Sequence, residues 1–249
     1  MARLDRHQAF ELNLSLNPHL KKYIGDRAAR GFGRADYVLD LQPAMKTMEE
    51  FNFIYPVAPP AFIHASRLGA GGKHYIVVEP AMSKETSAKY DTIAEAFRRE
   101  CGDLVKNAPA GERGKTAVDF VDRMTRAPKK GPGGRLAGIF GIGKPPTVQV
   151  SPEERLVISL RLVRDTKDHG ALTPVIGDPY VDEMVSAGGG RLDVVHKVWG
   201  TMETGIKFGD ARMLDALFEK EASHPGRGWE QNKTITFRTS HNTTGIIQR

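Results

Sequence analysis

The hydrophobic pattern of this chain changes its period twice between residues 151 and 218, and this restricts the folds that the chain can adopt. A helix is predicted to begin after Ser151, because the serine can cap it, a proline follows at the first helical position, and Glu154 completes a capping box. Gly170 is expected to end this helix. Its expected buried stripe consists of Leu156, Val157, Leu160 and Val163.

Strand-like runs follow this helix and are predicted to pair as an antiparallel meander; they cover residues 181–186, 192–198 and 201–208. The turns between them contain glycine, at residues 187–190 and 199–200. Asp210 is expected to cap a second helix, whose apolar residues are Met213, Leu214, Leu217 and Phe218. The order of helix, strands and helix is typical of a small open sheet covered by helices.

The N-terminal half is predicted to contain helices and one β-hairpin. Pro18 and Gly31 bracket a helix, at positions where proline starts helices and glycine stops them. Two β-prone runs around residues 69–72 form the hairpin; they cover residues 61–68 and 74–80. A long helix is expected from Ser83, with an apolar face made of Tyr90, Ile93, Ala94, Phe97, Cys101 and Leu104. A shorter helix is expected at residues 116–126, with Val118, Val121 and Met124 on one side.

Together these elements predict an α+β fold. Residues 1–127 form a helical N-terminal part with a β-hairpin, and residues 128–150 form a loop or linker rich in glycine and proline. Residues 151–225 form an α+β subdomain, a small antiparallel sheet covered by helices, and residues 226–249 form a diverged or flexible tail. Cys101, the one cysteine of the chain, lies on an apolar helix face, which indicates a packed core thiol rather than a nucleophile.

The charge of the chain is unevenly distributed. Residues 1–145 contain 23 Lys and Arg against 16 Asp and Glu, a net charge of +7, whereas residues 146–249 contain 13 against 14, a net charge of −1. A basic surplus fits an acidic partner such as nucleic acid or an anionic lipid, and it also fits a merely solvated face. No run reaches the roughly 20 apolar residues that span a bilayer, so we expect no transmembrane segment. The single cysteine is compatible with a reducing cytoplasm, where we expect the protein to act.

Neither of two glycine-rich segments has the context of a phosphate-binding loop. Residues 138–144 fit the pattern G-x-x-x-x-G-K, but Pro145 and Pro146 stand where such a loop needs a hydroxyl and a helix start. Residues 188–190 link two strand-like runs and lead to no helix. The carboxylates and histidines that could be tested as metal ligands lack ligand spacings; they are Asp165, Asp168, His169, Asp178, Asp182, Glu183 and His196. We predict no catalytic residue, cofactor site or metal site in this chain.

Several motifs occur in a fixed order along the chain. They read Tyr75-Ile76-Val77-Val78-Glu79-Pro80, then Val163-Arg164-Asp165 with Gly170, then Asp178-Pro179-Tyr180-Val181-Asp182-Glu183-Met184, and finally Asp193-Val194-Val195-His196-Lys197-Val198-Trp199-Gly200 with Thr204-Gly205-Ile206-Lys207-Phe208. This series resembles the N-terminal domain of secretion-superfamily ATPases, in particular the archaeal members that serve archaella, type IV pili and type II/IV secretion. The resemblance is dense over residues 153–222 and thin over residues 61–105.

The resemblance implies a structural role, not a catalytic one, for the following positions: Arg164, Asp165, Gly170, Asp178, Pro179, Asp182, Glu183, His196, Gly200 and Phe208. In that family the Walker A, Walker B and histidine boxes come later, and they have no counterpart here. The implied partners are an ATPase motor domain, further copies of the chain in a ring, and a membrane platform protein. ATP and Mg²⁺ belong to the motor domain.

Two questions stay open at this point. The chain can be a fragment, a truncated or diverged gene product, or a free-standing relative of the family. The alternative function is a stand-alone binder of nucleic acid or of an anionic surface, motivated by the basic surplus of residues 1–145. No helix-turn-helix, zinc spacing or aromatic RNA-binding motif accompanies that surplus, so nucleic acid is not the expected partner.

Overall fold

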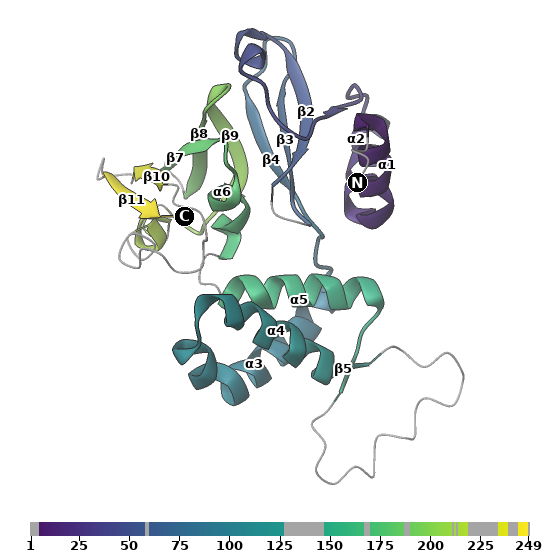
Figure 1. The fold of residues 1–249 in the computed structure, drawn as a ribbon, viewed down its shortest axis with the longest axis vertical. Helices are drawn as coiled ribbons and strands as arrows, with labels where there is room; N and C mark the ends of the chain where they lie inside the picture. Colours follow the sequence, from purple (N-terminus) through teal and green to yellow (C-terminus); the bar gives the residue numbers. More distant parts are fainter. Residues whose placement is uncertain are drawn as a thin grey trace. The chain divides into compact units, whose positions relative to one another are not determined.

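The computed structural model describes residues 5–57, 60–126, 147–166, 170–186, 190–210, 212, 214–218, 234–238 and 244–248. The chain divides into two compact units (Figure 1). The sheet unit comprises Met1–Pro80 and Ala171–Arg249, and the helical unit comprises Ala81–Gly170. In sequence, the helical unit is therefore an insertion within the sheet unit. The fold is α+β, as the sequence predicts.

One mixed sheet forms the centre of the sheet unit, with nine strands among the described residues. The strands are β1 (Asp36–Tyr37), β2 (Phe51–Pro56), β3 (Phe62–Arg67), β4 (His74–Val78), β7 (Val181–Ser186), β8 (Arg191–His196), β9 (Gly200–Lys207), β10 (Thr234–Arg238) and β11 (Thr244–Gln248). Their order across the sheet is β1-β2-β3-β4-β9-β8-β7-β10-β11. The predicted hairpin and the predicted meander are both present.

The hairpin and the meander belong to the same sheet because β4 pairs in parallel with β9. This β4–β9 junction consists of two register pairs, His74 with Glu203 and Tyr75 with Thr204. By contrast, β2 and β3 pair along six positions. The junction is therefore a short ladder between two longer antiparallel groups.

Helices cover the sheet on both faces. The sheet unit contains α1 (Arg6–Leu16), α2 (Pro18–Ala29), α6 (Thr173–Gly177), the short 3-10 helices η1 (Pro43–Thr47) and η2 (Gly170–Leu172), and helical residues at 214–218. Leu20 of α2 packs with Ile54 of β2 in one core cluster. Figure 1 shows helix α2 beside strands β2–β4. Tyr55, the next residue of β2, points to the opposite face, where Leu214 and Phe218 pack in the other cluster.

The helical unit consists of α3 (Lys84–Asn107), α4 (Ala110–Met124) and α5 (Pro152–Thr166), together with a short parallel pair of β5 (Thr125–Arg126) and β6 (Val148–Gln149). The three helices share one core of apolar side chains: Ile93, Ala96, Phe97, Cys101, Ala117, Phe120, Val121, Met124, Val150, Ile158 and Leu162. Cys101 is packed in this core, as predicted, and burial raises the pKa of its thiol.

The buried faces of these helices agree only in part with those predicted. In α3, Ile93, Phe97 and Cys101 are buried as predicted. In α5 the buried apolar residues are Ile158 and Leu162, whereas Leu156, which was predicted to be buried, is 48% exposed. In α3, Leu104 is 67% exposed. Helix α5 has apolar residues on more than one side, so the spacing alone does not select the side that meets α4.

The two units also differ from the residue ranges predicted as domains. Helices α3 and α4 were expected in the region 1–127 and α5 in the region 151–225, but the three helices pack in a single unit. Local periodicity gives each helix an apolar face without identifying its partner. Within the range 226–249, expected to be a diverged or flexible tail, β10 and β11 pair with each other, and β10 adds to the sheet beside β7.

Candidate functional site

Three residues of the predicted motifs, Tyr75, Asp178 and His196, meet in one buried group centred on the carboxylate of Asp178. Asp178 follows α6 and begins the turn that leads into β7, where its Oδ1 accepts the backbone N–H of Tyr180 at 2.8 Å. Its Oδ2 accepts the hydroxyl of Tyr55 at 2.8 Å and that of Tyr75 at 2.9 Å. These are the hydrogen bonds that an ionised carboxylate accepts. We call Tyr55, Tyr75, Asp178 and His196 the Asp178 cluster.

The protons of this cluster follow from its hydrogen bonds. The Nδ1 of His196 accepts the backbone N–H of Val198 at 3.1 Å, so the ring carries its proton on Nε2. That N–H donates to the Tyr55 oxygen at 3.2 Å, and the Tyr55 hydroxyl in turn donates to Asp178. Burial, and secondarily Lys197, lowers the pKa of His196 to about 3. Burial and the charge of Asp178 raise the pKa of Tyr55 well above its ordinary value. The protons are therefore fixed at neutral pH.

Aromatic stacking surrounds the cluster and extends it to the turn between β8 and β9. The ring of Trp199 stacks on Phe51 with centroids 4.4 Å apart and on His196 at 4.8 Å. Its Nε1 donates to the carbonyl of Met45 at 3.2 Å. The ammonium group of Lys73 donates to the Trp199 carbonyl at 2.6 Å. These contacts connect the β2–β4 group with the β7–β9 group across the sheet.

Chemically, the Asp178 cluster is a structural element. Each of its four side chains is at most 1% exposed. A catalytic acid or base must reach a hydrogen-bonding position on its substrate, and these groups are closed to a substrate on all sides. Satisfied polar networks of this kind fix one arrangement of the surrounding strands. The cluster thus joins two halves of the sheet that are far apart in sequence.

The other motif residues of the sheet unit shape the meander. The Pro179 carbonyl accepts the ammonium group of Lys197 at 2.7 Å, and Asp182, which is exposed, forms an ion pair with the same group at 3.5 Å. Glu183 pairs in register with Val195 of β8. Gly200 begins β9 with a φ of +71°, a conformation that favours glycine. The backbone N–H of Phe208 donates to the Gly190 carbonyl at 2.8 Å.

The remaining motif residues lie in the helical unit, so the structure does not gather all of them at one place. Arg164 is buried in α5, and this burial lowers the pKa of its guanidinium. Asp165 accepts the hydroxyl of Tyr90 and forms an ion pair with Arg161 at 3.3 Å. Gly170 has a φ of +49° at the start of η2. Asp168, His169 and residues 138–144 lie outside the described residues.

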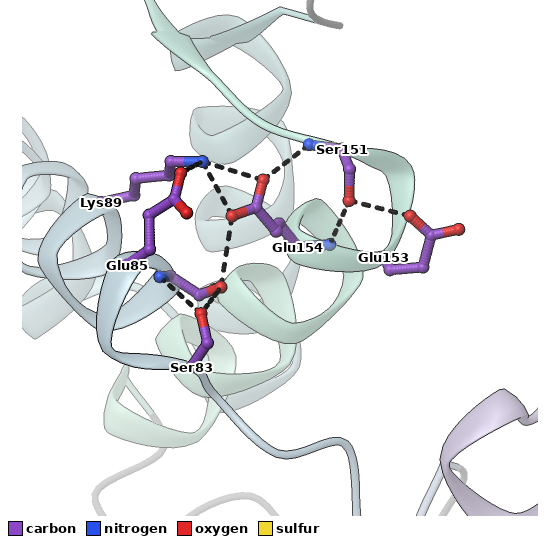
Figure 2. A network of polar contacts seen from close by, with 7 residues as sticks. Ser83, Glu85, Lys89, Ser151, Glu153 and Glu154 are labelled. Atoms are coloured by element: carbon purple, nitrogen blue, oxygen red, sulfur yellow. Dashed lines mark hydrogen bonds and ion pairs between the residues drawn. The ribbon is translucent and has the colours of Figure 1, made fainter. Parts of the chain in front are cut away.

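A second polar network holds the N-terminal ends of α3 and α5 together (Figure 2). The predicted capping box is confirmed: the Ser151 hydroxyl accepts the Glu154 N–H at 3.2 Å, and Glu154 accepts the Ser151 N–H at 2.8 Å. Glu154 also forms an ion pair with Lys89 of α3 at 2.8 Å and accepts the Thr86 hydroxyl at 3.2 Å. The hydrogen bond from Lys89 is the main cause that lowers the pKa of Glu154. The sequence shows the capping box, but no nearby motif predicts that Lys89 pairs with Glu154.

Neither a metal centre nor a membrane span is found in the part of the chain that the structure describes. No group of three or more His, Cys, Asp or Glu side chains there is placed to hold a metal ion. No helix among these residues combines the length and the apolar character needed to cross a bilayer.

The sequence motifs do not include Tyr55, which joins the Asp178 cluster from β2, a strand that the sequence analysis did not predict.

The chain has an archaeal relative among known proteins. No family model matches the chain. The chain is similar to an uncharacterized protein of Methanocaldococcus jannaschii, with 30% identity over 220 residues. The aligned region covers 85% of this chain but 38% of that protein, so the chain spans well under half of the length of its relative.

Proposed function

We propose that this chain is a non-catalytic N-terminal module of a secretion, archaellum or pilus assembly ATPase. In this proposal it mediates ring assembly, transmits interdomain motion and contacts the membrane platform protein. It acts in the cytoplasm and reaches the membrane through that protein partner. ATP and Mg²⁺ bind to the motor domain with which the module assembles.

One observation carries the proposal: motif residues that the resemblance places far apart meet in one buried cluster. Tyr75 comes from the first motif and Asp178 and His196 from later ones, yet the Tyr75 hydroxyl donates to Asp178, and Tyr55 links Asp178 to His196. The spacing of these motifs therefore has a physical reason, which is a shared framework. A framework role is what the resemblance implies for this part of the chain.

The packing supports a mechanical role. A sheet fixed by a satisfied buried network and stacked aromatic rings moves as a body, because close-packed interiors deform little. Rigid-body movement of domains is one of the ways in which ligand-driven changes reach distant surfaces. The relative of M. jannaschii also has room for a motor domain, since most of its length lies outside the aligned region.

The first test examines the sequence of the relative. The proposal predicts a Walker A motif in the part of the M. jannaschii protein outside the aligned region. If that part lacks a nucleotide-binding motif, the proposal fails. The second test is biochemical. The purified chain should not hydrolyse Mg-ATP by itself, and it should bind a separately expressed motor domain and change its ATP turnover. Hydrolysis by the chain alone would contradict the proposal.

A matched pair of variants tests whether the effect on ATP turnover depends on the Asp178 cluster or follows from the loss of any carboxylate charge. Asp178→Asn disturbs the buried cluster and should weaken the effect on ATP turnover. Asp26→Asn makes the same chemical change at an exposed carboxylate of α2, which pairs with Lys22, and should leave the effect intact. Strong, salt-sensitive binding to random double-stranded DNA without any effect on the motor domain would instead favour the alternative function.

A further inference from the structure

Two cavities lie in the sheet unit beside α2, and one arginine borders both. The first has a volume of about 240 Å³ and an apolar lining that includes Phe10, Leu14 and Ile54. The second has a volume of about 260 Å³ and lies against the β3–β4 turn, next to His74. Arg27 of α2 lines both cavities. The side chains of the Asp178 cluster line neither of them.

Arg27 has an unusual position for a cation. Its Nε is buried and has no hydrogen-bond partner among the described residues. Its guanidinium carbon lies 3.8 Å from the centroid of the Phe32 ring, so one face of the group is covered by an aromatic side chain. A buried donor without an acceptor is destabilising, and a charged donor more so. The guanidinium therefore has one unsatisfied donor and a charge that no carboxylate lining the cavities balances.

The charges around the cavities indicate the sign of that acceptor. Arg34 also borders the first cavity, with its guanidinium carbon 5.8 Å from the Phe10 ring. Neither cavity is lined by an aspartate or a glutamate. His64, another lining residue, is occupied: its Nδ1 accepts the Tyr23 hydroxyl at 2.6 Å and its Nε2 lies 2.6 Å from the Asn52 oxygen. Among the described residues that line the two cavities, the buried donor without an acceptor is the Nε of Arg27.

We propose that this site binds a small amphipathic carboxylate, whose apolar part fills the first cavity and whose carboxylate pairs with Arg27. A volume of about 240 Å³ lies below the range typical of drug-sized ligands, which fits a short aliphatic or aromatic acid. A neutral apolar ligand leaves Arg27 without an acceptor. A divalent cation finds no acidic ligand here. A carboxylate matches the fork of a guanidinium.

This site is independent of the proposed motor function, because it uses neither ATP nor the Asp178 cluster. The test uses the full chain and three probes with the same eight-carbon chain: octanoate, octan-1-ol and octylammonium. Titration calorimetry should show saturable binding of octanoate and none of octylammonium. Amide shifts in a ¹H–¹⁵N spectrum should change around Tyr23, Ile24 and Ala35. The spectrum reports the site without any substitution.

Two variants complete the test. Arg27→Met keeps the length of the side chain, removes its charge, and should weaken octanoate binding about tenfold or more, since charge-assisted pairs are the stronger hydrogen bonds. Arg30→Met makes the same change one turn further along the chain, at an exposed residue that lines neither cavity, and should bind like the wild type.

Several results would overturn the proposal. These are the absence of saturable octanoate binding, equal binding of octan-1-ol, and amide shifts elsewhere in the molecule. A folded Arg27→Met variant that binds octanoate as tightly as the wild type would also overturn it. A peptide with a free C-terminal leucine that binds more tightly than octanoate would assign the site to a protein segment and exclude the small ligand.

Discussion

Replacing Tyr55 by phenylalanine removes one oxygen atom from the interior of the sheet unit and breaks two hydrogen bonds. The ring stays, so the aromatic packing against Tyr180 is preserved. The hydroxyl that donates to Asp178 at 2.8 Å is lost, and the Nε2–H of His196 loses the oxygen that accepts it at 3.2 Å. Because all three side chains are buried, water does not replace the missing partner.

The expected destabilisation follows from these two losses. A hydrogen bond to a charged acceptor contributes about 1.5–3 kcal/mol, and a buried donor left without an acceptor costs about 1–3 kcal/mol. We expect Tyr55→Phe to lower the free energy of unfolding by about 3 kcal/mol. Tyr75→Phe removes one donor from the same carboxylate oxygen and leaves His196 paired, so it should cost about half as much.

Urea unfolding measures both values. The transition should be followed by tryptophan fluorescence, because Trp199 stacks on His196 and reports the sheet unit, and by circular dichroism for the helices. Two probes are needed because the two units need not unfold together. If Tyr55→Phe is within 0.5 kcal/mol of the wild type, roughly the range of neutral surface substitutions, or is milder than Tyr75→Phe, the proton arrangement proposed for the cluster is wrong.

Acidification should destabilise the fold, because burial lowers the pKa of His64 to about 4 and that of His196 to about 3. Below about pH 6.5 the folded state binds fewer protons than the unfolded state, so the free energy of unfolding is highest above that pH. It falls toward pH 4 and 3 by about 1.4 kcal/mol per pH unit for each histidine. Urea unfolding at pH 7, 6 and 5 measures this fall, and an unchanged free energy of unfolding would contradict it. Gly190→Ala should lower the melting temperature more than Gly200→Ala. Both glycines have positive φ, but a Cβ at Gly190 overlaps backbone oxygens, while a Cβ at Gly200 meets only a lysine ammonium at 4.0 Å. Equal melting temperatures of the two variants would exclude that clash. The buried thiol of Cys101 should react with Ellman's reagent much more slowly in the native than in the urea-unfolded chain, and fast native labelling would contradict its place in the core.

The parts of the fold that the sequence predicts are those set by local pattern. Strands β3 and β4 show an apolar run on each side of a glycine-rich turn, and β7–β9 repeat that arrangement. Gly31, Gly69 and Gly200 have positive φ, and each stands at a turn or helix end that the sequence marks. Local turn chemistry is therefore a sufficient guide to these elements.

The parts that the sequence does not predict depend on distant partners. Strand β2 is buried at most positions, so it lacks the alternation by which half-exposed strands are found. Tyr55 lies in this strand, 123 residues from Asp178 and 141 residues from His196. Asp178 and His196 were predicted as structural positions, but nothing near them in the sequence points to Tyr55. The site is thus predicted in part: Tyr75, Asp178 and His196 lie in the motifs, whereas Tyr55, which links Asp178 to His196, follows only from the fold.

The insertion of the helical unit explains why the sheet unit needs a buried polar cluster. Residues 81–170 separate β1–β4 from β7–β11 in the sequence, so pairing β4 with β9 closes a long connection, and the entropy of this closure opposes the pairing. The β4–β9 junction itself offers only two register pairs. The Asp178 cluster spans this junction, with Tyr75 on β4 and His196 at the end of β8, and Lys73 adds a hydrogen bond to the Trp199 carbonyl. These side-chain bonds add to the two register pairs of the junction, so protonation of His196 in acid should weaken the pairing of β4 with β9.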